Sequence, residues 1–207
     1  IVEGFGVLSA YILTGLFIIY FCCDVNLVTF DCKEKPMALI KQINDKIPQF
    51  GENCYLAENA TIIGDLKCGD NCSFWFNAVV RADVHFIKMG NKVNVQDGAI
   101  VHCTYKKHPT TIGDNVSIGH NAIVHGCTVK DNVLIGMGAI VMDNCIVESN
   151  SIIAAGAVVT RGTHVESGCI YAGTPAKKIK KVDQSLFEGE IMRIADNYLK
   201  YSSWYKV

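Results

Sequence analysis

A six-residue repeat constrains the fold of this chain more than any other feature of its sequence. Apolar residues followed by small or polar residues recur every six positions, with breaks after Val80 and Val101 and one five-residue step from Val124 to Val129. Such a regular repeat is typical of a solenoid. The repeated positions are Leu56, Ile62, Cys68, Phe74, Val80, Met89, Val95, Val101, Ile112, Ile118, Val124, Val129, Ile135, Val141, Val147, Ile153, Val159, Val165 and Tyr171.

Each six-residue unit supplies one short strand and one corner. Three units then make a triangular coil, and the coils stack as parallel strands ~4.8 Å apart with the apolar residues inside. Glycine, asparagine and aspartate fill many corners, as in residues 112–115, because they tolerate turn conformations. A β-sandwich would show a period of two with irregular turns. The sequence therefore predicts a mainly β protein, a left-handed parallel β-helix over residues 37–182.

The two breaks and the C-terminus predict features outside this prism. The breaks from Val80 to Met89 and from Val101 to Ile112 predict loops that protrude, and such breaks often mark the functional face of a solenoid. Residues 183–207 predict a final helix. Its apolar stripe requires a surface on the prism or on a neighbouring subunit. The stripe consists of Phe187, Ile191, Ile194 and Tyr198.

Residues 1–36 do not follow the repeat. The uncharged run from Gly4 to Cys23 is about as long as a membrane span. As an anchor it lacks preceding Lys or Arg residues, and as a signal peptide it lacks a basic start. We favour a third interpretation, in which Met37 is the natural start and residues 1–36 are an apolar extension outside the fold. A membrane anchor or targeting segment is the alternative.

Charge and cysteine content narrow the partners and the compartment. A formal net charge of -1 gives no basic surplus for binding nucleic acid. The ten cysteines contain no CxxC motif, so a four-thiolate zinc site has no support. Several lie at apolar repeat positions, where a reduced thiol packs well, although in a secreted domain of this size they could form disulfides. We therefore expect a reducing, cytoplasmic location.

Three histidines near the centre of the chain predict a metal site. His102 and His125 each directly follow an inward residue, so both side chains point outward. If the break after Val101 is one side of the triangle with an inserted loop, the two histidines lie one coil apart on the same face. His120 lies near a corner on another face, where only a neighbouring subunit of a homotrimer could add it to the pair. Three imidazoles with one open position are typical of catalytic zinc.

Four segments carry a resemblance to a known family. They are residues 75–83 (WFNAVVRAD), 94–102 (NVQDGAIVH), 119–126 (GHNAIVHG) and 171–175 (YAGTP). Together they resemble the gamma-class carbonic anhydrase family of hexapeptide-repeat proteins. The resemblance implies a homotrimer that interconverts carbon dioxide and bicarbonate through a metal-bound hydroxide. The implied metal is zinc, or iron (Fe²⁺) or cobalt (Co²⁺) in some members.

The resemblance also implies roles for individual residues. By motif position the metal ligands are His102, His120 and His125, at subunit interfaces. The other implied site residues are Gln96, which would hydrogen-bond the metal-bound water or hydroxide, the interfacial ion pair of Arg81 and Asp83, Asp97 beside that pair, and Tyr171 in the last motif.

The proton relay of the best-studied family members is missing. A glutamate follows the Arg-x-Asp motif there, and another lies on a long acidic loop after the first ligand. Here Val84 takes the first position, and the loop 103–111 is short and basic. His85 and His108 are candidate proton shuttles because imidazole titrates in the useful range, although we favour an ordinary loop residue as the interpretation of each.

Two rival functions share this fold. A hexapeptide-repeat acyltransferase or thioesterase acting on acyl-CoA needs one basic histidine at a subunit interface rather than three that converge. A metal-bound but catalytically weak family member is consistent with the missing acidic relay. Metal content separates the first rival from the carbonic anhydrase interpretation, and hydration kinetics separate the second.

Overall fold

The computed structural model describes residues 11–13, 16–18 and 37–205. The chain divides into two compact units, residues 1–35 and 36–207. In the first, β1 (Tyr11–Leu13) pairs antiparallel with β2 (Leu16–Ile18). The rest of the interpretation of residues 1–36 lies outside the described residues. None of the helices in the described ranges has the length and apolar character needed to cross a membrane.

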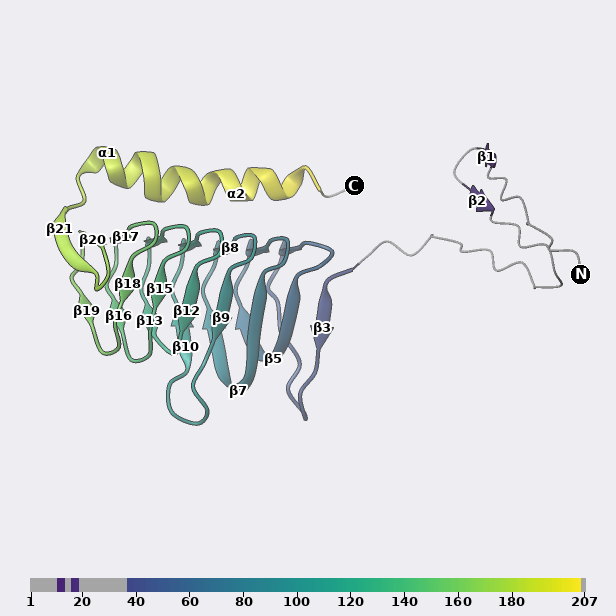
Figure 1. Ribbon diagram of the computed structural model, residues 1–207, viewed down its shortest axis with the longest axis horizontal. Helices are drawn as coiled ribbons and strands as arrows, with labels where there is room; N and C mark the ends of the chain where they lie inside the picture. Colours follow the sequence, from purple (N-terminus) through teal and green to yellow (C-terminus); the bar gives the residue numbers. More distant parts are fainter. Residues whose placement is uncertain (1–10, 14–15, 19–36, 206–207) are drawn as a thin grey trace, which may run out of the picture. The chain divides into compact units, whose positions relative to one another are not determined.

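The second unit is a three-sided prism of stacked parallel strands (Figure 1). Face A contains β3 (Leu39–Lys41), the first halves of β5 (Thr61–Cys68) and β7 (Val79–Met89), β9 (Ile100–His102), β12 (Ile123–His125), β15 (Ile140–Val141) and β18 (Val158–Val159). Face B contains the second halves of β5 and β7, β10 (Thr110–Ile112), β13 (Thr128–Val129), β16 (Ile146–Val147) and β19 (His164–Val165). Face C contains β4 (Tyr55–Leu56), β6 (Ser73–Phe74), β8 (Asn94–Val95), β11 (Ser117–Ile118), β14 (Leu134–Ile135), β17 (Ile152–Ile153) and β20 (Cys169–Ala172), which pairs antiparallel with β21 (Lys177–Lys181).

The repeated apolar residues fill the inside of the prism. Phe74, Val101, Ile118 and Ile135 are completely buried, and they belong to one continuous core. Because strand side chains alternate between the two sides of a sheet, one inward residue per strand leaves its neighbours pointing outward. The prediction of a left-handed parallel β-helix with a C-terminal helix is confirmed.

Asparagines form the corners of several successive coils. Asn115, Asn132 and Asn150 have positive φ angles of 57°, 56° and 62°. Asparagine tolerates this left-handed conformation better than most residues. Their side chains also bond in a ladder, with the Asn115 amide donating to Asn132 (3.0 Å) and that of Asn132 donating to Asn150 (3.1 Å). The corners are therefore fixed by backbone conformation and by side-chain hydrogen bonds between coils.

The two breaks in the repeat have different structures. Residues 103–109 form the predicted protruding loop between β9 and β10 (Figure 1). The predicted loop between Val80 and Met89 is wrong, because β7 is continuous across this break. The strand turns from face A to face B, and residues 83–86 lie opposite Asp65 as an irregularity in the pairing with β5. The extra residues are thus absorbed at a corner.

The C-terminal helix lies along the prism and covers face C (Figure 1). It comprises α1 (Gln184–Leu186), the π-helical turn η1 (Phe187–Met192) and α2 (Arg193–Ser203). Asp183 caps its start by accepting a hydrogen bond from the Leu186 amide. Ile191 is buried, and the ring of Tyr198 packs edge-on against Trp75 at 5.1 Å. The apolar stripe is therefore satisfied by the prism of the same chain.

Candidate metal centre

His102 and His125 form a stacked pair on face A. They end the adjacent strands β9 and β12, and their backbones are paired in register. The Nδ1 atom of His102 lies 3.0 Å from the Nε2 atom of His125. The prediction that the two histidines stack one coil apart on the same face is confirmed.

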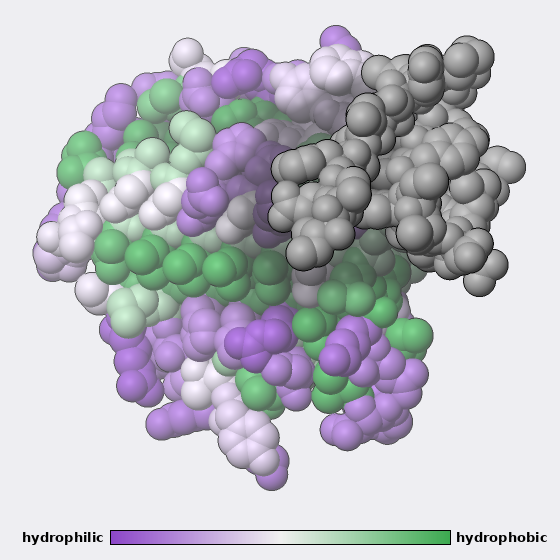
Figure 2. All heavy atoms as spheres, turned by 45° about the vertical axis from the view of Figure 1, so that its right-hand side comes forward, coloured by the Kyte–Doolittle hydropathy of each residue, from purple (hydrophilic) through white to green (hydrophobic). Residues whose placement is uncertain are grey.

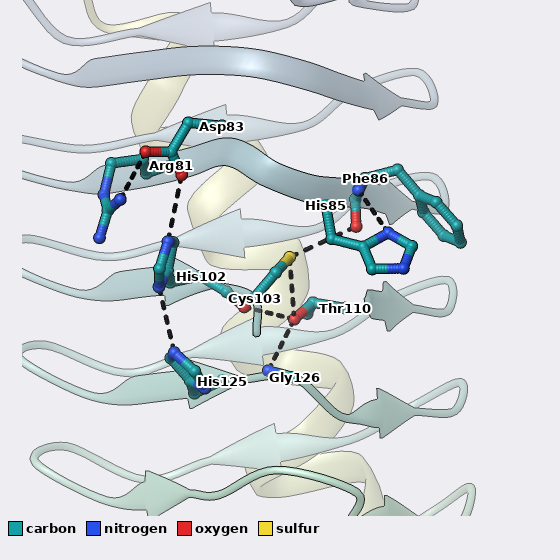
Figure 3. A network of polar contacts seen from close by, with 9 residues as sticks. All are labelled: Arg81, Asp83, His85, Phe86, His102, Cys103, Thr110, His125 and Gly126. Carbon is teal, nitrogen blue, oxygen red and sulfur yellow. Dashed lines mark hydrogen bonds and ion pairs between the residues drawn. The ribbon is translucent and has the colours of Figure 1, made fainter. Parts of the chain in front are cut away.

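Each histidine of the pair has an inner ring nitrogen, which faces the other histidine, and an outer ring nitrogen, which faces a carboxylate. The Nε2 atom of His102 lies 3.2 Å from Asp83, and the Nδ1 atom of His125 lies 2.8 Å from Asp143. Figure 3 shows Asp83, His102 and His125 as one chain of contacts, with Arg81 at its end. Each carboxylate favours the tautomer in which the ring nitrogen that faces it carries the proton, and in that tautomer the two inner nitrogens face each other with lone pairs. This arrangement favours a cation between the rings.

Further hydrogen bonds hold both carboxylates. The Arg81 guanidinium donates to Asp83 at 2.6 Å, and the Thr104 hydroxyl donates to Asp143 at 2.8 Å. Partial burial alone would raise the pKa of Asp83, but the hydrogen bonds from Arg81 and His102 lower it. Likewise, the bonds from Thr104 and His125 outweigh burial and lower the pKa of Asp143. Both groups therefore stay ionised near neutral pH and orient the imidazoles.

Burial also keeps His102 neutral. Desolvation by burial lowers its pKa most, and the positive charge of Arg81 lowers it further. The hydrogen bond and negative charge of Asp83 act in the opposite direction and raise it. Neutral imidazole is the form that binds metal ions. The electrostatics of the pair thus suit a metal ligand.

His120 lies at the opposite end of face A from this pair. It occupies the turn between β11 and β12, five positions before His125 along the chain. At ~3.3 Å per residue, this is up to about 16 Å. Its Nδ1 atom contacts Asp97 at 2.9 Å, and its Nε2 atom lies 3.2 Å from the Tyr198 hydroxyl. One chain therefore brings together two of the three predicted ligands.

Gln96 and Asp97 belong to the surroundings of His120 rather than to the histidine pair. Gln96 is buried, and its side-chain amide donates to Asn94 at 3.0 Å. Gln96, His120 and Tyr198 all line a cleft of about 410 Å³ between face C and α2. The predicted residues thus form two groups, one at each end of face A.

Three other predicted residues lie apart from the pair. Tyr171 is buried in the core on face C. It lies four coils further along the prism than Val95, and at the usual strand spacing of ~4.8 Å four coils span roughly 19 Å. His85 lies beside Phe86, on the side of the network away from His125 (Figure 3). His108 is nearer to the pair, because its loop packs against the corner at Gly126, where Asp143 also lies. Its Nε2 atom is buried without a hydrogen-bond partner.

Sequence reasoning missed Asp143 and Thr104. The available signal for Asp143 was its position 18 residues after His125, which is one coil further along the prism. Thr104 belongs to the loop, where the repeat gives no guide to side-chain direction. Fold and site together define a hexapeptide-repeat β-helix protein with a carboxylate-supported histidine pair on one face.

Comparisons with known proteins identify the family. Residues 126–161 match the family described as bacterial transferase hexapeptide (six repeats). A carbonic anhydrase of Geobacillus kaustophilus is 39% identical over 168 residues, which cover 81% of this chain and 91% of that protein. The mitochondrial gamma carbonic anhydrase 1 of Arabidopsis thaliana is 39% identical over 169 residues, covering 79% of this chain and 60% of the relative.

A solved structure agrees with these relatives. A hexapeptide transferase family protein from Anaplasma phagocytophilum superposes with a TM-score of 0.76 at 38% identity, covering 81% of this chain and 98% of that one. The chain therefore belongs to the gamma carbonic anhydrase family of hexapeptide-repeat proteins.

Proposed function

We propose that this chain is a metal-dependent carbonic anhydrase that hydrates carbon dioxide to bicarbonate reversibly. The observation that carries the proposal is the 3.0 Å approach of the His102 and His125 inner nitrogens, whose outer nitrogens are held by Asp83 and Asp143. Two imidazoles on one tetrahedral zinc, with bonds of ~2.0 to 2.1 Å, hold their nitrogens about 3.3 Å apart. The donor set and its spacing therefore fit a zinc ion, and Fe²⁺ or Co²⁺ fit the same nitrogens.

The third ligand would be His120 of a neighbouring chain in a homotrimer. Face A carries an outward row of apolar residues beside the histidines, paired strand to strand: Val79, Ile100, Ile123, Ile140 and Val158. Ile100 is 40% exposed, and Figure 2 shows apolar side chains gathered in a band along the prism. An apolar band bordered by polar groups is typical of a protein interface. This band supports a subunit contact that would bring His120 to the pair.

When bound, the ion would act as a Lewis acid that lowers the pKa of a water molecule at its open position. The residues of the chain would position and neutralise the site. Asp83 and Asp143 fix the tautomers of His102 and His125, and Arg81 balances the charge of Asp83. Gln96 of the neighbouring chain would orient the substrate, because Gln96 lines the same cleft as His120.

Proton release needs a group in contact with solvent. We assign this role to His108 rather than His85. The His108 loop packs beside Asp143, whereas His85 lies against Phe86 on the far side of the network. His108 itself is partly exposed to solvent, and its buried Nε2 atom has no hydrogen-bond partner and is available to a proton or a water molecule. A proton leaving the histidine pair would pass to this imidazole and then to solvent.

Acyl transfer from coenzyme A is the second candidate function. The cleft of about 410 Å³ beneath α2 favours it, since His120 lies there beside Gln96 and could act as a single base. The resemblance to a hexapeptide transferase family structure has the same implication. Acyl-CoA binding together with negligible metal content would support this alternative.

Stopped-flow hydration of carbon dioxide tests the enzyme proposal. Protein purified without oxygen and loaded with Zn²⁺ or Fe²⁺ should hydrate carbon dioxide faster than the His125→Ala variant. Equal rates at full metal loading would instead identify a metal-bound protein without this activity. Replacing His164, which contacts Glu148 on the exposed surface, with Ala provides a matched control for loss of an imidazole.

Subunit mixing tests the shared site separately. His120→Ala and His125→Ala variants should each bind metal poorly, but co-refolding them should restore about a quarter of the sites, because a random trimer joins an intact pair to an intact His120 with that frequency. No recovery in mixed trimers would contradict a site built from two chains.

A further inference from the structure

Three cysteines converge at a corner of the prism away from the histidine pair. Cys54 directly precedes β4, Cys68 ends β5, and Cys72 directly precedes β6. Cys54 and Cys72 occupy equivalent positions one coil apart, because the next residues, Tyr55 and Ser73, are paired in register. Cys68 lies across the turn from Cys72. The topology therefore brings all three thiols to the corner between faces B and C.

Their sulfur atoms form a compact group. All three lie within 4.8 Å of one another, and the Cys54 and Cys68 sulfurs are 4.0 Å apart. A metal–sulfur bond of ~2.3 Å places three sulfurs around one ion at about 4.0 Å from each other. Within the described ranges this is the one group of at least three histidine, cysteine or acidic side chains with such spacing. The sulfurs are therefore already close to the arrangement of a three-coordinate centre.

The surroundings of the group favour a soft ion. Cys68 and Cys72 are buried in the apolar core, while Cys54 is half-buried and gives access from solvent. The Cys54 sulfur lies 3.4 Å from the Gly69 carbonyl oxygen, and the Cys72 sulfur lies 3.2 Å from the Gly90 carbonyl oxygen. The three sulfurs are thus gathered at the edge of the apolar core, with one of them accessible from solvent.

We propose that Cys54, Cys68 and Cys72 bind one thiophilic monovalent metal ion, Cu(I), through their three sulfur atoms. Soft thiolates select Cu(I), whereas structural zinc sites require a fourth ligand that the described residues do not add to this group. Binding displaces the thiol protons to solvent and transfers no electron. This site is independent of the carbonic anhydrase proposal, because it shares no residue with the histidine pair or the cleft.

Copper competition tests the proposal directly. The full chain would carry serine at Cys22, Cys23 and Cys32, so that only cysteines in the prism contribute. Cu(I) is then titrated into the reduced, oxygen-free protein against the chelator bathocuproine disulfonate. We expect one equivalent per chain to be withheld from the chelator, with sulfur-to-copper absorption in the ultraviolet.

Two variants and one control decide the outcome. Cys72→Ser and Cys54→Ser should each weaken copper binding at least about tenfold, because each leaves two sulfurs. Cys145→Ser is the matched control, since Cys145 is also 1% exposed and also follows an Asp-Asn pair. It should bind copper as the parent does, with circular dichroism confirming that all three variants fold. The proposal is overturned if the parent withholds no copper or if the Cys54 and Cys72 variants still withhold it.

Discussion

The Nδ1 atom of His102 lies 3.0 Å from the Nε2 atom of His125 on the adjacent coil. Asp83 and Asp143 contact the outer nitrogens and favour the tautomers in which these nitrogens donate, so that the two inner nitrogens direct lone pairs at each other. Such an approach is repulsive unless a proton or a metal ion lies between the rings. The pair is therefore preorganised for a cation, and its supporting carboxylates orient the imidazoles.

Replacing Asp143 with Asn should weaken metal binding by about 10- to 100-fold, the usual cost of losing the carboxylate behind a histidine ligand. Asp143 holds the Nδ1 atom of His125 at 2.8 Å and is itself held by Thr104. Zinc affinity measured against a competing chelator checks this. Glu148→Gln removes the carboxylate from another histidine contact, at His164, and should leave the affinity unchanged.

The metal-free protein should lose stability as pH falls below the ordinary histidine value of 6.5. Burial lowers the pKa of folded His102, so the unfolded chain binds the proton more readily and stability rises with pH through this window. The stability that depends on neutral His102 is complete above pH 6.5, and it is lost as the pH falls toward the pKa of His102 in the folded protein. Asp83 and Asp143 act separately, because their lowered pKa values affect stability only below about 3.8.

Thermal unfolding of chelator-treated protein between about pH 7.5 and pH 5 measures this slope. The His102→Gln variant should show a smaller dependence on pH across the same range. An equal slope in both proteins would mean that other histidines account for the loss of stability.

The repeat was sufficient to predict the inward residues and the stacking of His102 on His125. Both follow because each strand has one residue that points inward and each six-residue unit forms one face of the prism. It was not sufficient to predict what happens at the corners. Residues 83–86 extend β7 rather than forming a loop, and Asp143 meets His125 from the next coil. Corner contacts depend on insertions and turn geometry, which change the number of residues per coil.

The group of Cys54, Cys68 and Cys72 could likewise not be predicted from the sequence. Sequence reasoning searched for CxxC spacing, which describes two ligands on one short turn. Cys54 and Cys72 meet because they are one coil apart, and Cys68 joins them across a turn. Their ligand spacing is thus a property of the stacked coils and could not be read before the register of the coils was known.

If His120 completes the metal site in the proposed trimer, replacing Tyr198 with Phe should strengthen metal binding or leave it unchanged. The Tyr198 hydroxyl lies 3.2 Å from the Nε2 atom of His120, while Asp97 occupies the Nδ1 atom. Nε2 must therefore exchange this contact for the metal, and a hydrogen bond worth about 1 kcal/mol corresponds to roughly a fivefold difference in affinity. Chelator competition measures it, with Tyr201→Phe on the same helix as the control. A large loss of affinity in the Tyr198 variant alone would show that the hydroxyl supports ligation.

Replacing Asn132 with Ala should destabilise the prism by about 2 to 3 kcal/mol, combining left-handed backbone strain with lost hydrogen bonds. Asn132 has a φ of 56° and joins Asn115 to Asn150. Replacing it with Gly should recover about 1 kcal/mol of that loss, because glycine adopts positive φ without strain and still lacks the amide. Denaturant unfolding of the two variants separates the effect of backbone strain from that of the lost hydrogen bonds. If Ala and Gly are equally destabilising, the hydrogen-bond ladder rather than the backbone conformation determines the stability of these corners.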